Sequence, residues 1–168
     1  MTTKVALFLA HALAMEHEAA DRYDELADTM EVHNNMEVAE LFRQMAKFSR
    51  LHGASVAARS NGHELPKLKS WQYRWNTPEP PEVGAPGAAH YMMTAWHALD
   101  FALENEKRGH RFYADEASGS DDAEVRALAA EMAEEEEEHV AELEKWIART
   151  PKPEHDWAED PDEALVAD

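Results

Sequence analysis

The sequence repeats one helical pattern twice, and this repeat restricts the fold more than any other feature. Apolar residues recur every three or four positions from about Val125 to Trp146, which is typical of an amphipathic helix with one buried face. An earlier segment carries the same residues 87 positions before, in the pairs Val38/Val125, Leu41/Leu128, Met45/Met132, Ala46/Ala133 and His52/His139. The chain is therefore expected to contain two related halves.

Capping residues, turns and prolines divide the chain into four expected helices. They run from Thr2 or Thr3 to about Met30, from the turn at residues 32–35 to about Arg59, from about Pro86 to Ala117, and from the turn and cap at residues 118–121 to before Pro151. Their inward positions are expected to include Val5, Leu9, Ala12, Ala19, Leu26, Met30, Leu41, Met45, Phe48, Ser49, Val56, Met92, Leu99, Ala102, Leu128, Met132, Val140, Leu143 and Ile147.

A connector at residues 61–86 determines the topology. It contains five of the eight prolines and the aromatic residues Trp71, Tyr73 and Trp75. About 25 extended residues, at ~3.3 Å each, span more than the ~40 Å length of a 27-residue helix, so the connector can cross a whole bundle. Four long helices with a long crossover between the second and third predict an all-α, ferritin-like four-helix bundle at residues 1–150. Residues 151–168 form an acidic tail, expected to be extended or docked through Trp157.

The charge and composition exclude several classes of function. The net charge of −19 argues against a nucleic-acid or anionic-membrane surface and is compatible with attraction of cations. The chain has no cysteine, so any metal site must use oxygen and nitrogen ligands. The apolar run at residues 5–10 is too short to span a bilayer and continues into a helix, so we expect no secretory leader and a cytoplasmic protein.

The fourth expected helix carries an acidic run, Glu134–Glu138, followed by His139. If the apolar stripe continues through this run, Glu136 and His139 face inward and the other four glutamates face mostly water. Residues three apart share a helix face, so this Glu-x-x-His pair can offer a carboxylate and an imidazole to one metal ion. The same motif is also typical of a solvated acidic face beside a core histidine.

The first and third expected helices share a second motif. Glu16 precedes Tyr23 by seven residues, and Glu106 precedes Tyr113 by seven. Two helical turns separate each pair on one face, so each tyrosine can lie one layer from its carboxylate as a hydrogen-bonding group. Each half of the chain thus carries a glutamate, a tyrosine and then a histidine.

This pattern resembles the ferritin-like superfamily of non-haem di-iron proteins, and within it the rubrerythrins most, over roughly residues 3–149. In such bundles two helices each contribute a glutamate and two each contribute Glu-x-x-His to a metal site in the core. The resemblance implies that the ligands here are Glu16, His52, Glu106, Glu136 and His139.

The sequence departs from this family at one ligand. The repeat that places Glu136 in the fourth helix places Ser49 at the same position in the second, and a neutral hydroxyl cannot replace a bridging carboxylate. Three carboxylates supply −3 against +4 for two divalent ions, so a dinuclear site needs a further anion. His110, close to Glu106 around the third helix, is either a recruited ligand or a partly exposed histidine. Gly109 stands where rubrerythrins often carry another glutamate.

The function implied by the resemblance is a non-haem iron protein, with one or two ions, that reacts with hydrogen peroxide or dioxygen as a peroxidase or ferroxidase. Manganese or zinc are alternative metals. Without cysteine there is no rubredoxin-like module, so a peroxidase would need a separate electron donor. We also expect a homodimer. The opposing hypothesis is a non-enzymatic bundle with a degraded metal site, which Ser49 and Gly109 favour and the buried carboxylates oppose.

Overall fold

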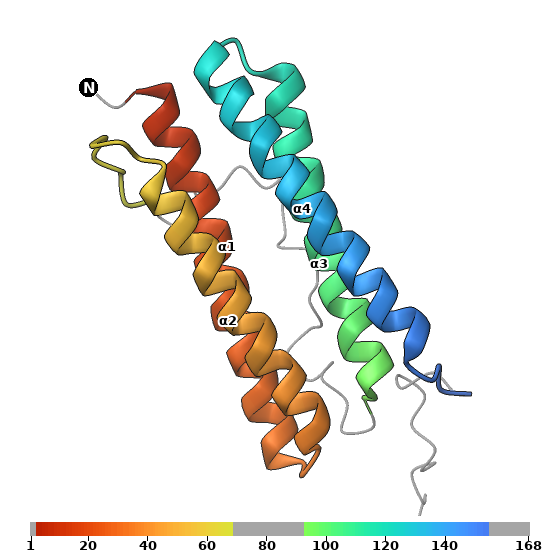
Figure 1. The fold of residues 1–168 in the computed structure, drawn as a ribbon. Helices are drawn as coiled ribbons and strands as arrows, with labels where there is room; N and C mark the ends of the chain where they lie inside the picture. Colours follow the sequence, from red (N-terminus) through yellow and green to blue (C-terminus); the bar gives the residue numbers. More distant parts are fainter. Residues whose placement is uncertain (1–2, 69–92, 155–168) are drawn as a thin grey trace, which may run out of the picture.

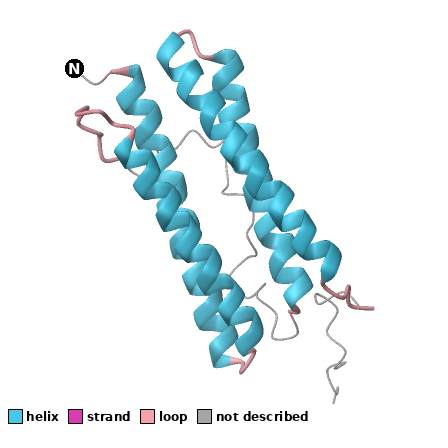
Figure 2. Cartoon of the chain, viewed as in Figure 1, coloured by secondary structure: helices cyan, strands magenta, loops and turns pink. Residues whose placement is uncertain are grey.

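A computed structural model describes residues 3–68 and 93–154, and its regular structure in these ranges is entirely helical (Figures 1 and 2). The helices are α1 (Lys4–Val32), α2 (Met36–Ala58), α3 (Ala95–Gly119) and α4 (Ala123–Arg149). Helix α1 packs along α2 and α3 packs along α4, which gives two antiparallel hairpins lying side by side (Figure 1). The predicted all-α four-helix bundle is confirmed.

Side-chain caps fix the starts of α1 and α4. Thr3 Oγ1 accepts a hydrogen bond from the Ala6 N–H at 3.1 Å. Asp122 Oδ1 accepts from the N–H groups of Glu124 and Val125 at 2.9 and 3.1 Å. Each cap pairs backbone donors that have no partner within the helix. The cap of α4 is therefore Asp122, one residue beyond the predicted turn and cap at residues 118–121.

Helix α3 differs from its predicted limits at both ends. Met93 and Thr94 are not helical, so the prediction of helix from Pro86 is wrong at these two residues, and residues 86–92, with Met92, lie outside the described ranges. Thr94 and His97 form a reciprocal capping box, in which His97 Nδ1 accepts from the Thr94 N–H at 3.2 Å. The capping box was not recognised in the sequence because a histidine stands in place of the usual Glu or Gln. At its other end α3 continues to Gly119 rather than stopping at Ala117.

The predicted crossover between α2 and α3 is confirmed by contacts at the two ends of the bundle. At one end the Asn35 side chain, in the α1–α2 turn, donates to the Met93 carbonyl at 2.6 Å. At the other end Lys4 pairs with Asp121 at 2.6 Å. Helix α2 finishes beside the start of α1, whereas α3 starts beside the α1–α2 turn, so the chain between them must span the bundle (Figure 1).

The buried apolar residues form two clusters, one toward each end of the bundle. The first gathers around Tyr23, Phe42 and Leu99, and the second around Phe8, Val56 and Tyr113. The buried polar residues Glu16, Ser49 and Glu136 belong to neither cluster. The hydrophobic burial that stabilises the bundle is thus divided into two parts, with polar groups between them.

The buried face of α2 is rotated from its predicted position. Phe48 was predicted to face inward but is 44% exposed, whereas Phe42 is completely buried, with its ring centroid 6.1 Å from those of Tyr23 and Phe101. Gly53 lies on the same buried face as Phe42, and a Cβ built there would be in ordinary van der Waals contact with the Glu16 Cβ, at 3.6 Å. Phe48 lies outside this buried face.

The remaining predictions concern the end of α4, the connector and the acidic tail. Helix α4 stops at Arg149, before Pro151, as predicted. The aromatic residues of the connector and Trp157 of the tail lie outside the described residues, and the division at residue 150 stays a prediction. None of the described helices is long and apolar enough to cross a membrane.

The two phenylalanines of α2 give a matched test of this packing. Phe42→Ala should lower the free energy of unfolding by about 3–5 kcal/mol, because it removes a fully buried ring and leaves a cavity. Phe48→Ala should change it by less than about 1 kcal/mol. Urea unfolding of both variants measures the difference, and equal losses would contradict the observed orientation of α2.

Candidate metal centre

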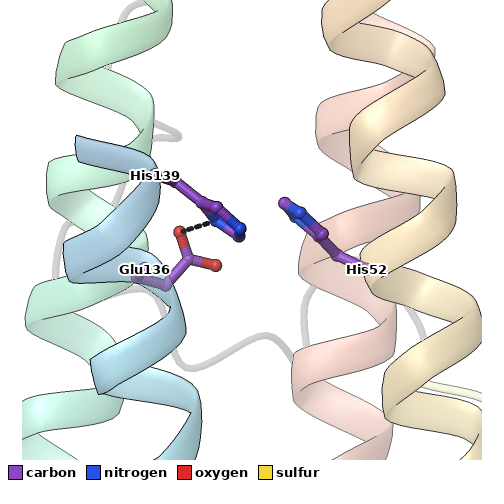
Figure 3. A group of neighbouring side chains, drawn as sticks. All are labelled: His52, Glu136 and His139. Atoms are coloured by element: carbon purple, nitrogen blue, oxygen red, sulfur yellow. Dashed lines mark ion pairs between the residues drawn. The ribbon is translucent and has the colours of Figure 1, made fainter. Parts of the chain in front are cut away.

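The two histidines of the repeat meet where the hairpins face each other. His52 projects from α2 and His139 from α4, and their rings stack with centroids 4.1 Å apart and planes 5° from parallel (Figure 3). Both are partly buried. Residues that match in sequence thus come together in space from opposite hairpins.

Each histidine lies near a glutamate from the other helix of its own hairpin. Glu16 Oε2 is 3.7 Å from His52 Nδ1, and Glu106 Oε2 is 3.7 Å from His139 Nδ1. Glu16 is 6% exposed, and the Glu106 side chain is 14% exposed. The predicted glutamates of α1 and α3 therefore occupy equivalent places on the two sides of the centre.

Glu136 adds a third carboxylate on the α3–α4 side only. It is 5% exposed, and its Oε2 lies 3.5 Å from His139 Nδ1 (Figure 3). Gly109 of α3 lies beside this carboxylate, since a Cβ built there would be in ordinary van der Waals contact with the Glu136 carboxyl carbon, at 3.6 Å. The prediction that Glu136 alone in the acidic run is buried is confirmed, because Glu134, Glu135, Glu137 and Glu138 are all exposed.

The equivalent position on α2 holds Ser49, which is also buried, with an exposure of 3%. The α1–α2 hairpin consequently offers one carboxylate and one imidazole, and the α3–α4 hairpin offers two carboxylates and one imidazole. The two hairpins therefore repeat the same helical pattern but contribute different numbers of carboxylates to the centre.

Burial and mutual repulsion govern the protonation of these groups. Burial raises the pKa of Glu136 to about 9, with the nearby Glu106 carboxylate acting in the same direction. Glu106 and Glu136 together raise the pKa of His139 to about 10. Burial works to raise the pKa of Glu106, but His139 and Glu136 outweigh it and lower that pKa. Burial also raises the pKa of Glu16. Near neutral pH without metal, protons on Glu136 and His139 therefore offset part of the buried negative charge.

The donor atoms of the centre fit a metal ion. One ligand atom from each of His52, Glu136 and His139 lies within 4.8 Å of the other two. Glu136 Oε2 and His139 Nδ1 are buried without hydrogen-bond partners among the described residues, and a cation between them would satisfy both. Carboxylate oxygens with imidazole nitrogens suit iron, manganese or zinc.

The two predicted tyrosines are both buried but differ in their partners. Asn105 Nδ2 donates to the Tyr23 hydroxyl at 3.0 Å, and Arg108 donates to Asn105 Oδ1 at 3.2 Å. The Tyr113 hydroxyl is buried without a partner among the described residues. Burial raises the pKa of both tyrosines, so both stay protonated as possible donors. Sequence reasoning missed Asn105, although a polar residue beside the inward Glu106 was a signal that could have found it.

His110, like Glu16 and Glu106, is not among the three side chains whose ligand atoms come together within the described ranges, and no ion pair joins it to the centre there. It is half-buried on α3, one turn beyond Glu106. Its role as an additional ligand stays a prediction.

The pKa shifts predict that the metal-free protein loses stability as the pH rises. Glu136 and His139 have folded pKa values above their ordinary values of 4.5 and 6.5, so the folded state binds more protons than the unfolded state. Their stabilising contribution is present at low pH and is lost toward pH 9 and 10, respectively. The melting temperature of metal-free protein should therefore fall between pH 6.5 and 9.

Glu136→Gln should make this decline shallower, whereas Glu137→Gln, next to it but exposed, should leave it unchanged. Thermal melts in chelating buffer measure both slopes. An unchanged slope in Glu136→Gln would contradict the assigned protonation.

Comparison with known proteins identifies the family of the chain. The rubrerythrin family model matches residues 8–73. The crystal structure at 2.00 Å of an uncharacterized conserved protein from Magnetospirillum magnetotacticum MS-1 is similar, with 55% sequence identity and a TM-score of 0.69. The match covers 92% of this chain and 100% of that one. No curated protein is significantly similar. The chain belongs to the rubrerythrin family of the ferritin-like superfamily.

Proposed function

We propose that this protein is a non-haem iron protein whose core centre reacts with hydrogen peroxide or dioxygen. The observation that carries the proposal is the meeting of Glu16, His52, Glu106, Glu136 and His139 from all four helices. Membership of the rubrerythrin family, which usually binds non-haem iron, supports the choice of metal.

The carboxylates and the histidines would have different roles in such a centre. Bound iron would supply electrons to the oxidant. Glu106 and Glu136 would neutralise positive charge, and His52 and His139 would complete the ligand set without adding charge. Peroxide reduction to two waters consumes two electrons and two protons. Protons held at neutral pH on Glu136 and His139 must leave when a cation binds, so metal affinity should increase with pH.

The supply of electrons separates the two candidate activities. Because the chain has no cysteine, it cannot form an iron–thiolate centre of its own, and a peroxidase would take electrons from a separate donor. A ferroxidase would need only ferrous iron and oxidant. Both activities require tight metal binding. The alternative is a non-enzymatic bundle, which does not require tight metal binding. The buried Ser49, in place of a carboxylate, supports this alternative.

The acidic run provides a test of metal binding with internal controls. Glu136→Gln should abolish tight binding, because it removes the buried carboxylate beside His139. Glu134→Gln and Glu137→Gln change exposed members of the same run and should leave binding nearly intact. Titration calorimetry of the three variants compares them, and uniform behaviour would count against the proposed centre.

Iron should also stabilise the protein and be oxidised by it. Saturating ferrous iron without oxygen should raise the melting temperature, because bound cation compensates buried carboxylates only in the folded state. Loaded protein should then consume added peroxide or dioxygen, measured by electrode. Stabilisation without consumption would favour the non-enzymatic bundle, and the absence of both would exclude the proposed function.

A further inference from the structure

We infer that the two halves of the metal centre are unequal: the chain binds one ion tightly beside Glu136 and His139, and a second ion beside Glu16 only weakly. This inference rests on the proposed function, which requires that metal binds at all. It concerns how many ions bind tightly and which helices hold them.

The inequality follows from a comparison of matched positions. Glu16 corresponds to Glu106, and His52 corresponds to His139, so each hairpin supplies one glutamate and one histidine. The remaining pair differs, because Glu136 on α4 corresponds in the repeat to Ser49 on α2, and both are buried. A hydroxyl is neutral and does not compensate the charge of a divalent ion as a carboxylate does.

The contacts place the tight ion on the α4 side. Glu136 Oε2 and Glu106 Oε2 lie 3.5 and 3.7 Å from His139 Nδ1. Two atoms in this group, Glu136 Oε2 and His139 Nδ1, are buried without hydrogen-bond partners in the described part of the chain, and no atom of Glu16 or His52 is in that condition. His52 reaches the same point from α2, since its ligand atom lies within 4.8 Å of those of Glu136 and His139.

The balance of charge between the carboxylates and the ions also favours a single tightly bound ion beside Glu136. One divalent ion is balanced by the two carboxylates Glu106 and Glu136, which leaves that side neutral. A second divalent ion would meet only the carboxylate of Glu16 and would leave a net positive charge in a buried site. Buried charge without a partner is unfavourable, so the second ion needs an external anion or stays weakly bound.

The test uses the matched pair Glu16→Gln and Glu106→Gln, with Co²⁺ added anaerobically to chelator-treated protein. Calorimetry gives the number of ions and their affinities, and visible absorption reports ligation independently of any activity. The wild type should bind one ion tightly. Glu106→Gln should lower the affinity for that ion by at least ~100-fold, and Glu16→Gln should lower it by less than ~10-fold, because only Glu106 contributes to the tight site.

A third variant, Ser49→Glu, supplies the missing carboxylate and should raise the number of tightly bound ions from one to two. Circular dichroism checks that each variant folds, and if Glu106→Gln does not fold, Ser49→Glu decides the question alone. Three outcomes would overturn the inference and leave the proposed function standing. They are two tightly bound ions in the wild type, equal losses of affinity in Glu16→Gln and Glu106→Gln, and a single tightly bound ion in folded Ser49→Glu. A wild type that binds no Co²⁺ and no iron would overturn both.

Discussion

The structure depends on placing three carboxylates inside a bundle of apolar helices. A buried charge without a partner costs several kcal/mol, so Glu16, Glu106 and Glu136 can coexist only if something compensates them. The bundle has two means of doing so: protons, whose binding the raised pKa values of Glu136 and His139 favour, and cations, which the same oxygen and nitrogen atoms can bind. The two apolar clusters on either side then carry the burial that offsets this unfavourable layer.

Much of this arrangement could be predicted from the sequence, because periodicity records which side chains face inward. A charged residue on an otherwise apolar stripe, as at Glu16, stays on that stripe in the fold, and Glu136 is likewise the buried member of five consecutive glutamates. The repeat predicted that His52 and His139 would be equivalent, and their stacked rings agree. The crossover followed from connector length alone, since it does not depend on any side-chain detail.

Periodicity could not predict which residues at the edge of an apolar stripe are covered by the neighbouring helices. The buried face of α2 includes Phe42 and excludes Phe48, and that outcome depends on contacts between helices rather than on the pattern of one helix alone. The different partners of Tyr23 and Tyr113 are unpredictable for the same reason. Their equal spacing from a glutamate suggests equal roles, but only the Tyr23 hydroxyl accepts a hydrogen bond from Asn105, across the bundle on α3.

The exposed glutamates around Glu136 affect a property that the buried ligands do not. Glu134, Glu137 and Glu138 lie on the surface of the same helical turns, within a chain of net charge −19. A negative surface around a site raises the local concentration of cations and so speeds their arrival, and salt weakens this effect. The departure of an ion from the proposed centre would instead be governed by the buried groups. Loading and retention of a cation would then depend on different residues of one helix, so ionic strength would change the rate of loading with little change in how long an ion stays.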